Sequence, residues 1–138
     1  MALILHNHGE VDGLKYFVNK EAPENLILKL FKNYLQPDAD DTVAAFTEAT
    51  FTGYGALTLV GASWGAPTGD EPATIEYGEQ TFLSSAAQAL QNVYGWYMVR
   101  AVSGRVVASE RFTNGPYSIS NDQDFIAVIP RLTLRGAV

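Results

Sequence analysis

The chain has 138 residues, which is room for one domain with one hydrophobic core. Its formal net charge of −6 opposes binding to nucleic acid, because affinity for phosphate backbones comes mainly from lysine and arginine. The sequence contains no cysteine, which excludes disulfides and thiolate metal sites and fits a protein made in a reducing cytoplasm.

The sequence begins with an apolar run, residues 1–5, that ends at His6. This run lacks the basic flank and the length of a signal peptide, and no apolar stretch approaches the roughly 18 residues that cross a membrane. We therefore expect neither an export signal nor a membrane partner. Residues 1–8 are predicted to form either an arm that reaches a neighbouring molecule or a plain edge strand, since the two share this composition.

One short helix is predicted over residues 9–20. Apolar residues recur there at helical spacing, namely Val11, Leu14, Phe17 and Val18. Acidic residues in the first turn suit the helix dipole, and Asn7 is a plausible N-cap. Because proline cannot continue a helix, Pro23 marks the latest possible end.

From residue 25 onward the apolar pattern has period two, which indicates strands. Strands are predicted over residues 25–34, 51–60, 74–77 and 80–83. Two glycines within the second of these indicate a bulge or a close approach of another backbone. Residues 84–91 are rich in alanine and glutamine and are predicted to form either a short helix or a polar loop.

The clearest strand pair is a hairpin of residues 93–102 and 105–112, joined by Ser103 and Gly104. The first strand is apolar on nearly both faces, with Val93, Tyr97 and Val99 on one face and Trp96, Met98 and Val102 on the other. Such a strand is either central in a two-layer packing or presents one face to a partner.

A last strand is predicted over residues 125–134, with Pro130 at an edge or a bulge because proline has no N–H for the ladder. The pattern as a whole is one short N-terminal helix followed by seven or eight short strands between turn residues. It predicts a mainly β fold, an antiparallel β-sandwich that is jelly-roll-like, with residues 1–138 in a single domain.

The segment Gly61–Gly65 reads GASWG and fits the G-x-S-x-G pattern of a hydrolase nucleophile. That mechanism requires a helix after Ser63 and a histidine later in the chain. Pro67 follows instead, and both histidines precede the serine. We interpret the segment as a glycine-flanked strand end.

Other combinations of polar residues are equally incomplete as chemical sites. His6 and His8 would need a third ligand, for which Glu10 is the candidate, and such a histidine pair is more often structural or solvated. The acidic turn at residues 38–41 lacks the glycine and glutamate of a calcium loop. No glycine-rich loop for phosphate is present in the sequence. We therefore predict that the protein is not an enzyme and has no catalytic residue, no cofactor and no metal.

Four segments of the sequence, in this order along the chain, carry a resemblance to a known family. They are APENLILKLFKN at 22–33, FTEATFTGY at 46–54, GWYMV at 95–99 and ERF at 110–112. Together they resemble a family of small virion proteins encoded in the structural-gene blocks of tailed bacteriophages, over residues 9 to 135. The resemblance implies a capsid decoration, or cement, protein that is located in the virion and stabilises the lattice of the major capsid protein.

A decoration protein needs apolar contact surface, and only 17% of these residues are charged against a usual share of about 25%. We expect a homotrimer that binds the major capsid protein through apolar residues near the N-terminus and two tryptophans: Met1, Leu3, Ile4, Leu5, Trp64 and Trp96. The alternative is a tail-associated or host-surface module that binds carbohydrate, with Tyr54, Trp64 or Tyr77 stacked on sugar rings. These aromatic residues could equally lie in the core.

Overall fold

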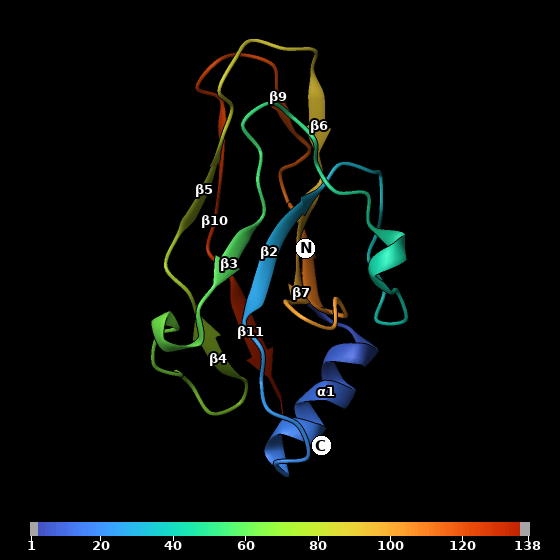
Figure 1. The fold of residues 1–138 in the computed structure, drawn as a ribbon, viewed down its shortest axis with the longest axis vertical. Helices are drawn as coiled ribbons and strands as arrows, with labels where there is room; N and C mark the ends of the chain where they lie inside the picture. The colour runs from blue at the N-terminus through green and yellow to red at the C-terminus, as the bar shows by residue number, and fades with distance from the viewer. Residues whose placement is uncertain (1–2, 136–138) are drawn as a thin grey trace.

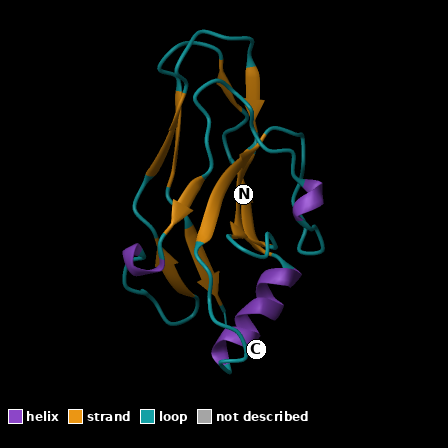
Figure 2. Cartoon of the chain, in the orientation of Figure 1, coloured by secondary structure: helices purple, strands orange, loops and turns teal. Residues whose placement is uncertain are grey.

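The computed structural model describes residues 3–135, which form a mainly β structure with an α-helix near the N-terminus (Figures 1 and 2). In chain order the elements are β1 (Ile4–Leu5), α1 (Asn7–Phe17), β2 (Leu26–Phe31), the 3-10 turn η1 (Val43–Ala45), β3 (Leu57–Leu59), the 3-10 turn η2 (Gly61–Ser63), β4 (Ala73–Glu76), β5 (Gln80–Leu83), β6 (Gln91–Val93), β7 (Gly95–Arg100), β8 (Val106–Arg111), β9 (Tyr117–Ile119), β10 (Phe125–Val128) and β11 (Arg131–Leu134). The predictions of a mainly β fold and of one N-terminal helix are confirmed.

The strands pair antiparallel in one five-stranded sheet and three two-stranded sheets. The large sheet has the order β1-β8-β7-β2-β3, and the small sheets pair β5 with β10, β4 with β11 and β6 with β9. The β5–β10 and β4–β11 pairs follow one another along one side of the molecule (Figure 1). Pro130 lies between β10 and β11, so the predicted strand over residues 125–134 is interrupted at the proline.

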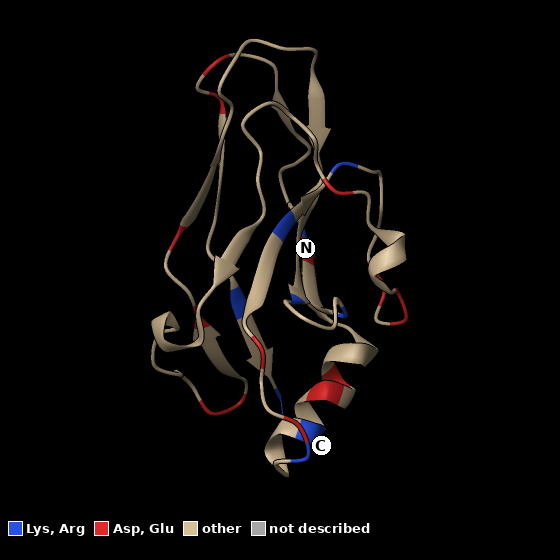
Figure 3. Ribbon diagram, viewed as in Figure 1, with Lys and Arg blue, Asp and Glu red and all other residues tan. Residues whose placement is uncertain are grey.

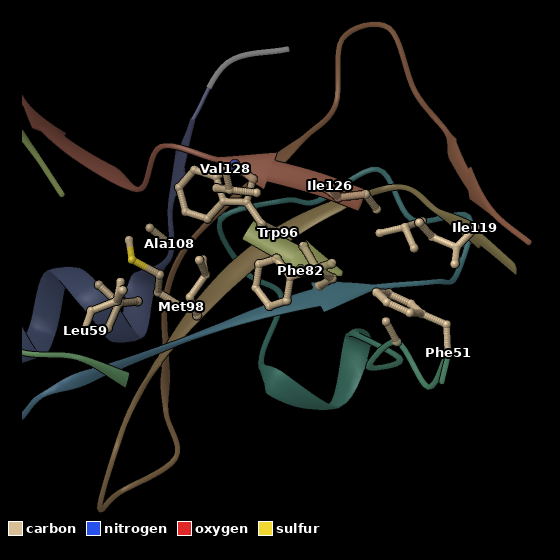
Figure 4. Packing of buried hydrophobic residues seen from close by; sticks show 14 residues of the cluster. Phe51, Leu59, Phe82, Trp96, Met98, Ala108, Ile119, Ile126 and Val128 are labelled. Atoms are coloured by element: carbon tan, nitrogen blue, oxygen red, sulfur yellow. The ribbon is translucent and has the colours of Figure 1, made fainter. Parts of the chain in front are cut away.

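The main hydrophobic core lies between one face of the large sheet and the small sheets. Leu28 and Leu30 of β2 and Trp96 and Met98 of β7 point into it. The residues that meet them are Phe82, Val93, Ile119, Ile126 and Val128 of the small sheets, with Leu59 of β3 and Phe51 from a loop (Figure 4). This core therefore joins strands from both ends of the sequence.

A second, smaller cluster covers the opposite face of β2 and β7. Phe46 stacks on Tyr97 with ring centroids 4.5 Å apart, and Phe31 meets Phe46 edge to face at 5.3 Å. Val99 and Val106 complete the cluster. Every residue of β7 is buried, which confirms the prediction that this strand is apolar on both faces and identifies it as central.

The hairpin of β7 and β8 differs from its prediction in its turn. Its connection runs over residues 101–105, five residues instead of two, and Gly104 adopts a φ of 72°. The register against β8 also shifts at an irregularity between Met98 and Val99. Val102 lies in the turn and not on the strand, and it is 88% exposed.

Two other predicted boundaries are also wrong. The helix begins at Asn7, with His6 as the N-cap residue, because the Asn7 side chain donates a 2.6 Å hydrogen bond to Asp40 instead of capping. Of the strand predicted over residues 51–60 only β3 forms, because Gly53 has a φ of 97° and packs against the backbone of β5. A Cβ at Gly53 would lie 2.5 Å from the carbonyl oxygen of Leu83, which is the close approach that the glycines indicated.

Gly95 tests how tightly β7 is packed. A Cβ there would lie 2.3 Å from the Glu110 carbonyl oxygen and 2.6 Å from the Phe31 ring. We predict that Gly95→Ala lowers the free energy of unfolding by about 1–3 kcal/mol, the usual cost of overpacking, as measured by urea denaturation. Gly13→Ala is the matched control, because nothing lies within 4 Å of its Cβ and alanine in a helix stabilises by about 1 kcal/mol. Equal stability of the two variants would contradict the packing described.

Candidate partner-binding groove

Helix α1 exposes its apolar side chains and buries a polar one. Leu14, Phe17 and the C-cap residue Val18 are 67%, 78% and 74% exposed, while the buried residues of the helix are Gly9 and Asp12. A surface helix normally packs its apolar stripe against the core. The orientation of α1 is therefore the reverse of what its amphipathic pattern predicts.

Two contacts explain this orientation. Gly9 lies so close to β8 that a Cβ would be 2.5 Å from the Val107 carbonyl oxygen. Asp12 is held in ion pairs, with its Oδ2 3.0 Å from Nη1 of Arg100 and 3.2 Å from Nε of Arg105. Both arginines belong to the β7–β8 hairpin, so the carboxylate of Asp12 fixes α1 to the end of the large sheet.

Arg100 is the centre of a larger buried charge cluster and is itself 5% exposed. Its Nη2 also pairs with Glu24 and lies 3.3 Å from Oε2 of Glu21, and its guanidinium lies 5.2 Å from the centre of the Tyr16 ring. Figure 3 shows acidic residues on α1 and on the segment between α1 and β2. Three carboxylates thus surround one buried cation.

Glu24 additionally binds the hairpin turn. Its Oε1 accepts hydrogen bonds from the backbone N–H groups of Val102 (2.6 Å) and Ser103 (3.0 Å). Burial alone would raise the pKa of Glu24, but these N–H donors and the charge of Arg100 outweigh it and lower the pKa. The segment after α1 is therefore held to the same turn as the helix.

A groove of about 1100 Å³ lies beside the exposed face of α1. It is lined by Leu14 and Phe17 of the helix, Ile75 of β4, Leu132 and Leu134 of β11, and Trp64. The same groove reaches Leu5, Leu26 and Val107, which lie at the end of the main core. The apolar interior thus continues into an open, apolar groove bounded by α1 and the β4–β11 pair.

The structure places the predicted contact residues in four different settings. Met1 lies outside the described residues. Ile4 and Leu5 form the edge strand β1 beside β8, and Leu3 and Leu5 pack against the main core, so here the edge-strand alternative is the one observed. Trp64 lines the groove and packs edge to face on Tyr77, with ring centroids 5.3 Å apart.

Trp96 of β7 is 3% exposed and belongs to the main core. It has no surface to offer a partner, because β7 is a central strand with packing on both faces. We therefore leave it out of the candidate surface.

The apolar face of α1 was missed by the sequence analysis. The helical spacing of Val11, Leu14, Phe17 and Val18 indicates a helix, but the same spacing normally assigns these residues to a core. The one signal in the sequence is an aspartate within the helix that has two arginines available in the later hairpin. Only the fold shows that these charges meet.

A histidine–serine pair with the geometry of a nucleophile and its base is present, but it is buried. Nε2 of His6 lies 2.7 Å from Oγ of Ser109, and both residues are fully buried. A reacting group could not reach Ser109 without opening the sheet edge at β1. The pair therefore fixes the chain between β1 and α1 and offers no site for a substrate.

The other polar combinations considered in the sequence stay apart or are satisfied locally. Ser63 ends the 3-10 turn η2, and no helix follows it. In the acidic turn Asp38 accepts the backbone N–H of Asp40, and Asp41 accepts that of Asp38. Among residues 3–135, no group of three or more histidine, aspartate or glutamate side chains is arranged to hold a metal ion.

Comparison of the chain with protein-family models, curated proteins and solved structures gave no match. Within the described part of the chain, α1 is the only α-helix, and it is too short and too polar to cross a membrane. The proposals below therefore rest on the geometry of this molecule and on the sequence resemblance already given.

Removing Asp12 should strongly destabilise the protein. Asp12→Ala leaves Arg100 buried without its best-placed partner, and breaking a buried ion pair on one side costs about 3–5 kcal/mol. Urea denaturation measures this loss. Glu10→Ala, an exposed glutamate on the same helix, should change stability by no more than about 0.5 kcal/mol. A loss below about 1 kcal/mol for Asp12→Ala would show that the ion pair does not hold α1.

His6 should make the stability pH-dependent in mildly acidic solution. Burial lowers the pKa of His6 from 6.5, although nearby carbonyls and Asp41 partly oppose this. The unfolded chain then binds a proton that the folded chain does not, so the free energy of unfolding falls as the pH drops below about 6.5. We predict that His6→Gln flattens the slope between about pH 6.5 and 5 in urea titrations, and an unchanged slope would contradict this prediction.

Proposed function

We propose that the chain is a non-enzymatic structural protein of a tailed-bacteriophage virion, a head decoration protein that binds and stabilises the major capsid protein lattice. The observation that carries this proposal is the open apolar groove beside the exposed face of α1. The resemblance of the sequence to phage structural proteins supplies the setting. The groove supplies the contact surface that such a protein needs.

The exposed apolar side chains of α1 beside this groove support binding of another protein. Monomeric proteins rarely expose contiguous apolar patches beyond a few hundred Å². Leu14 and Phe17 project beside an already apolar groove, and Val18 extends the same helix face. Burying each of these side chains contributes about 1.5–3 kcal/mol, roughly 5–9 kcal/mol for the three before the entropy of association is subtracted.

This gain is comparable to the cost of association, which is about 4–15 kcal/mol. The helix face alone therefore gives weak binding, and the rest of the groove must contribute. A subunit that also contacts its own copies on a regular lattice gains further through multivalency. We propose that the subunit does so as a trimer, whose mass light scattering of the purified protein would measure.

The architecture we propose for this subunit is a two-layer, jelly-roll-like β-sandwich formed by one domain. The large sheet would be one layer, and the β5–β10 and β4–β11 pairs the other. The shared core between them supports this interpretation, since residues of β2 and β7 pack against Phe82 of β5 and Ile126 of β10. The opening between the layers at one end is the groove.

A tail-associated or host-surface module that binds carbohydrate is the second candidate. Trp64 favours it, because this side chain is only half-buried and lines the groove. Sugar recognition also requires hydrogen-bonding groups around the aromatic ring, whereas the neighbours of Trp64 in the groove are mostly apolar. Tyr54 and Tyr77, the other predicted stacking residues, pack against the main core. We therefore rank carbohydrate binding below protein binding.

The composition and imaging of purified virions test the proposed function. We expect mass spectrometry to find this protein in the particle, and a particle reconstruction to place it on the outer surface of the capsid lattice with α1 facing a capsid subunit. Absence from the particle would refute the proposal. Location on the tail alone, together with glycan binding that Trp64→Ala abolishes, would establish the second candidate instead.

Replacing the exposed apolar residues of α1 should weaken binding without unfolding the protein. For the double variant Leu14→Ser and Phe17→Ser we predict at least a tenfold loss of affinity for particles that lack the protein, since one tenfold corresponds to about 1.4 kcal/mol. Val102→Ser is the matched control, because Val102 is also highly exposed but lies in the hairpin turn outside the groove. Equal binding by the double variant and the control would show that α1 is not the contact surface.

A further inference from the structure

Strand β11 has one free edge, and the hydrogen bonds of its neighbour show which backbone groups lie on it. Thr133 lies opposite Thr74 of β4, and Arg131 lies opposite Glu76. Thr74 exchanges both of its backbone hydrogen bonds with Thr68, and the carbonyl of Glu76 accepts one from the N–H of Gly65. The backbone N–H and C=O groups of Thr74 and Glu76 therefore point away from β11. In an antiparallel pair of strands, two directly opposed residues either both direct their backbone N–H and C=O groups toward each other or both direct them away. The backbone groups of Arg131 and Thr133 therefore point outward, away from β4.

Strand β1 has a free edge of the same kind. His6 donates a backbone hydrogen bond to Val107 of β8, and Ile4 lies opposite Ser109 in the same register. Because bonding alternates along an antiparallel ladder, the backbone groups of Leu3 and Leu5 point away from β8. Among the described residues, no hydrogen bond to these outward groups of β1 or β11 is present.

The two free edges face one slot. A cavity of about 430 Å³ is lined by Leu3, Leu5, Arg131, Thr133 and Arg135. The first four are the residues of β1 and β11 whose backbone groups point outward, and Arg135 is two residues after Thr133, so it continues the same alternation along the chain. The slot is continuous with the apolar groove, since Leu5, Thr133 and Arg135 line both. Unpaired backbone groups therefore stand beside apolar side chains.

We propose that the slot between β1 and β11 receives an extended segment of another protein, which pairs as an added strand with the edge of β11 and alternates apolar and acidic side chains. This inference rests on the proposed function and specifies how the partner binds. Strand addition to an open edge takes affinity from main-chain hydrogen bonds and specificity from alternate side chains. On β11 itself Leu132 and Leu134 alternate with Arg131, Thr133 and Arg135. An added strand would place apolar side chains beside the two leucines on one face of β11 and acidic side chains beside the arginines on the other face.

Charge decides against a second copy of this chain as the occupant. The charged residues that line the slot are arginines, although the whole chain carries a net charge of −6. If the β11 strands of two copies paired antiparallel about Thr133, Arg131 of one copy would lie opposite Arg135 of the other. Like charges directly opposed across a sheet are destabilising. Arg131 already pairs with Glu110 of β8, so Arg135 supplies the positive charge that an acidic side chain of the partner would meet.

The test uses the full chain and a synthetic seven-residue peptide that alternates valine and glutamate, with blocked ends. Isotope-edited NMR titration reports binding, and hydrogen exchange reports the amides of Arg131 and Thr133. We expect these two amides to exchange at least about tenfold more slowly in the complex, because each gains a hydrogen bond. A peptide with lysine in place of glutamate should bind about tenfold more weakly or not at all.

Two variants of one residue separate backbone pairing from side-chain contact. Thr133→Pro removes the outward N–H and is tolerated because proline suits an edge strand, whereas Thr133→Val keeps the N–H. We expect the proline variant to bind at least about tenfold more weakly and the valine variant to bind within about twofold of the original chain. Thermal denaturation of both variants checks that the fold is retained.

Several results would overturn the inference. These are no binding at about 1 mM peptide, binding that leaves the two amides unprotected, and equal binding of the glutamate and lysine peptides. Sedimentation that shows dimers of the free chain, lost in Thr133→Pro but not in Thr133→Val, would assign the edge to a second copy instead. The experiment needs no virions, so it can fail while the particle test of the proposed function succeeds, and the reverse also holds.

Discussion

The ion pair between Asp12 and Arg100 is the interaction on which the candidate surface depends. Helix α1 is too short to be stable by itself, because isolated helices of fewer than about 12–15 residues are marginal in water. Its apolar side chains do not bind it to the core, so its attachment comes from a carboxylate, a close glycine contact and the cluster around Arg100. A polar attachment leaves the apolar face free. The apolar side chains of α1, which would normally stabilise the fold by packing against the core, are thereby available to contact a partner.

The remaining architecture supports this arrangement. Central strand β7 is buried on both faces, and Arg100 is its last residue, so the cation is held at the end of a fully buried strand. The β4–β11 pair forms the opposite wall of the groove and leaves one edge unpaired. One face of the molecule therefore combines apolar side chains from a helix with unpaired backbone groups from a strand. This combination is typical of a surface that another chain completes.

The sequence predicted the features that depend on neighbouring residues. Alternation identified β5 within its true bounds and both faces of β7, and turn residues located the β7–β8 hairpin. The predictions failed where distant residues decide: the burial of Trp96 in the main core, the shortening of the strand at Gly53, and above all the position of α1. Leu14 and Phe17 follow a pattern that normally means core, and only the meeting of Asp12 with a hairpin some 90 positions later reverses it. Periodicity indicates which face is apolar, but not whether that face is covered.

Thiol labelling at a single introduced cysteine tests the central claim most directly, because the chain has no cysteine of its own. We predict that Phe17→Cys reacts with a maleimide as fast as Val102→Cys in the free protein, since both positions are highly exposed. On the assembled particle Phe17→Cys should become protected while Val102→Cys stays reactive. Slow labelling of Phe17→Cys in the free protein would show that the helix face is already buried, and equal labelling of both positions on the particle would show that no partner covers it.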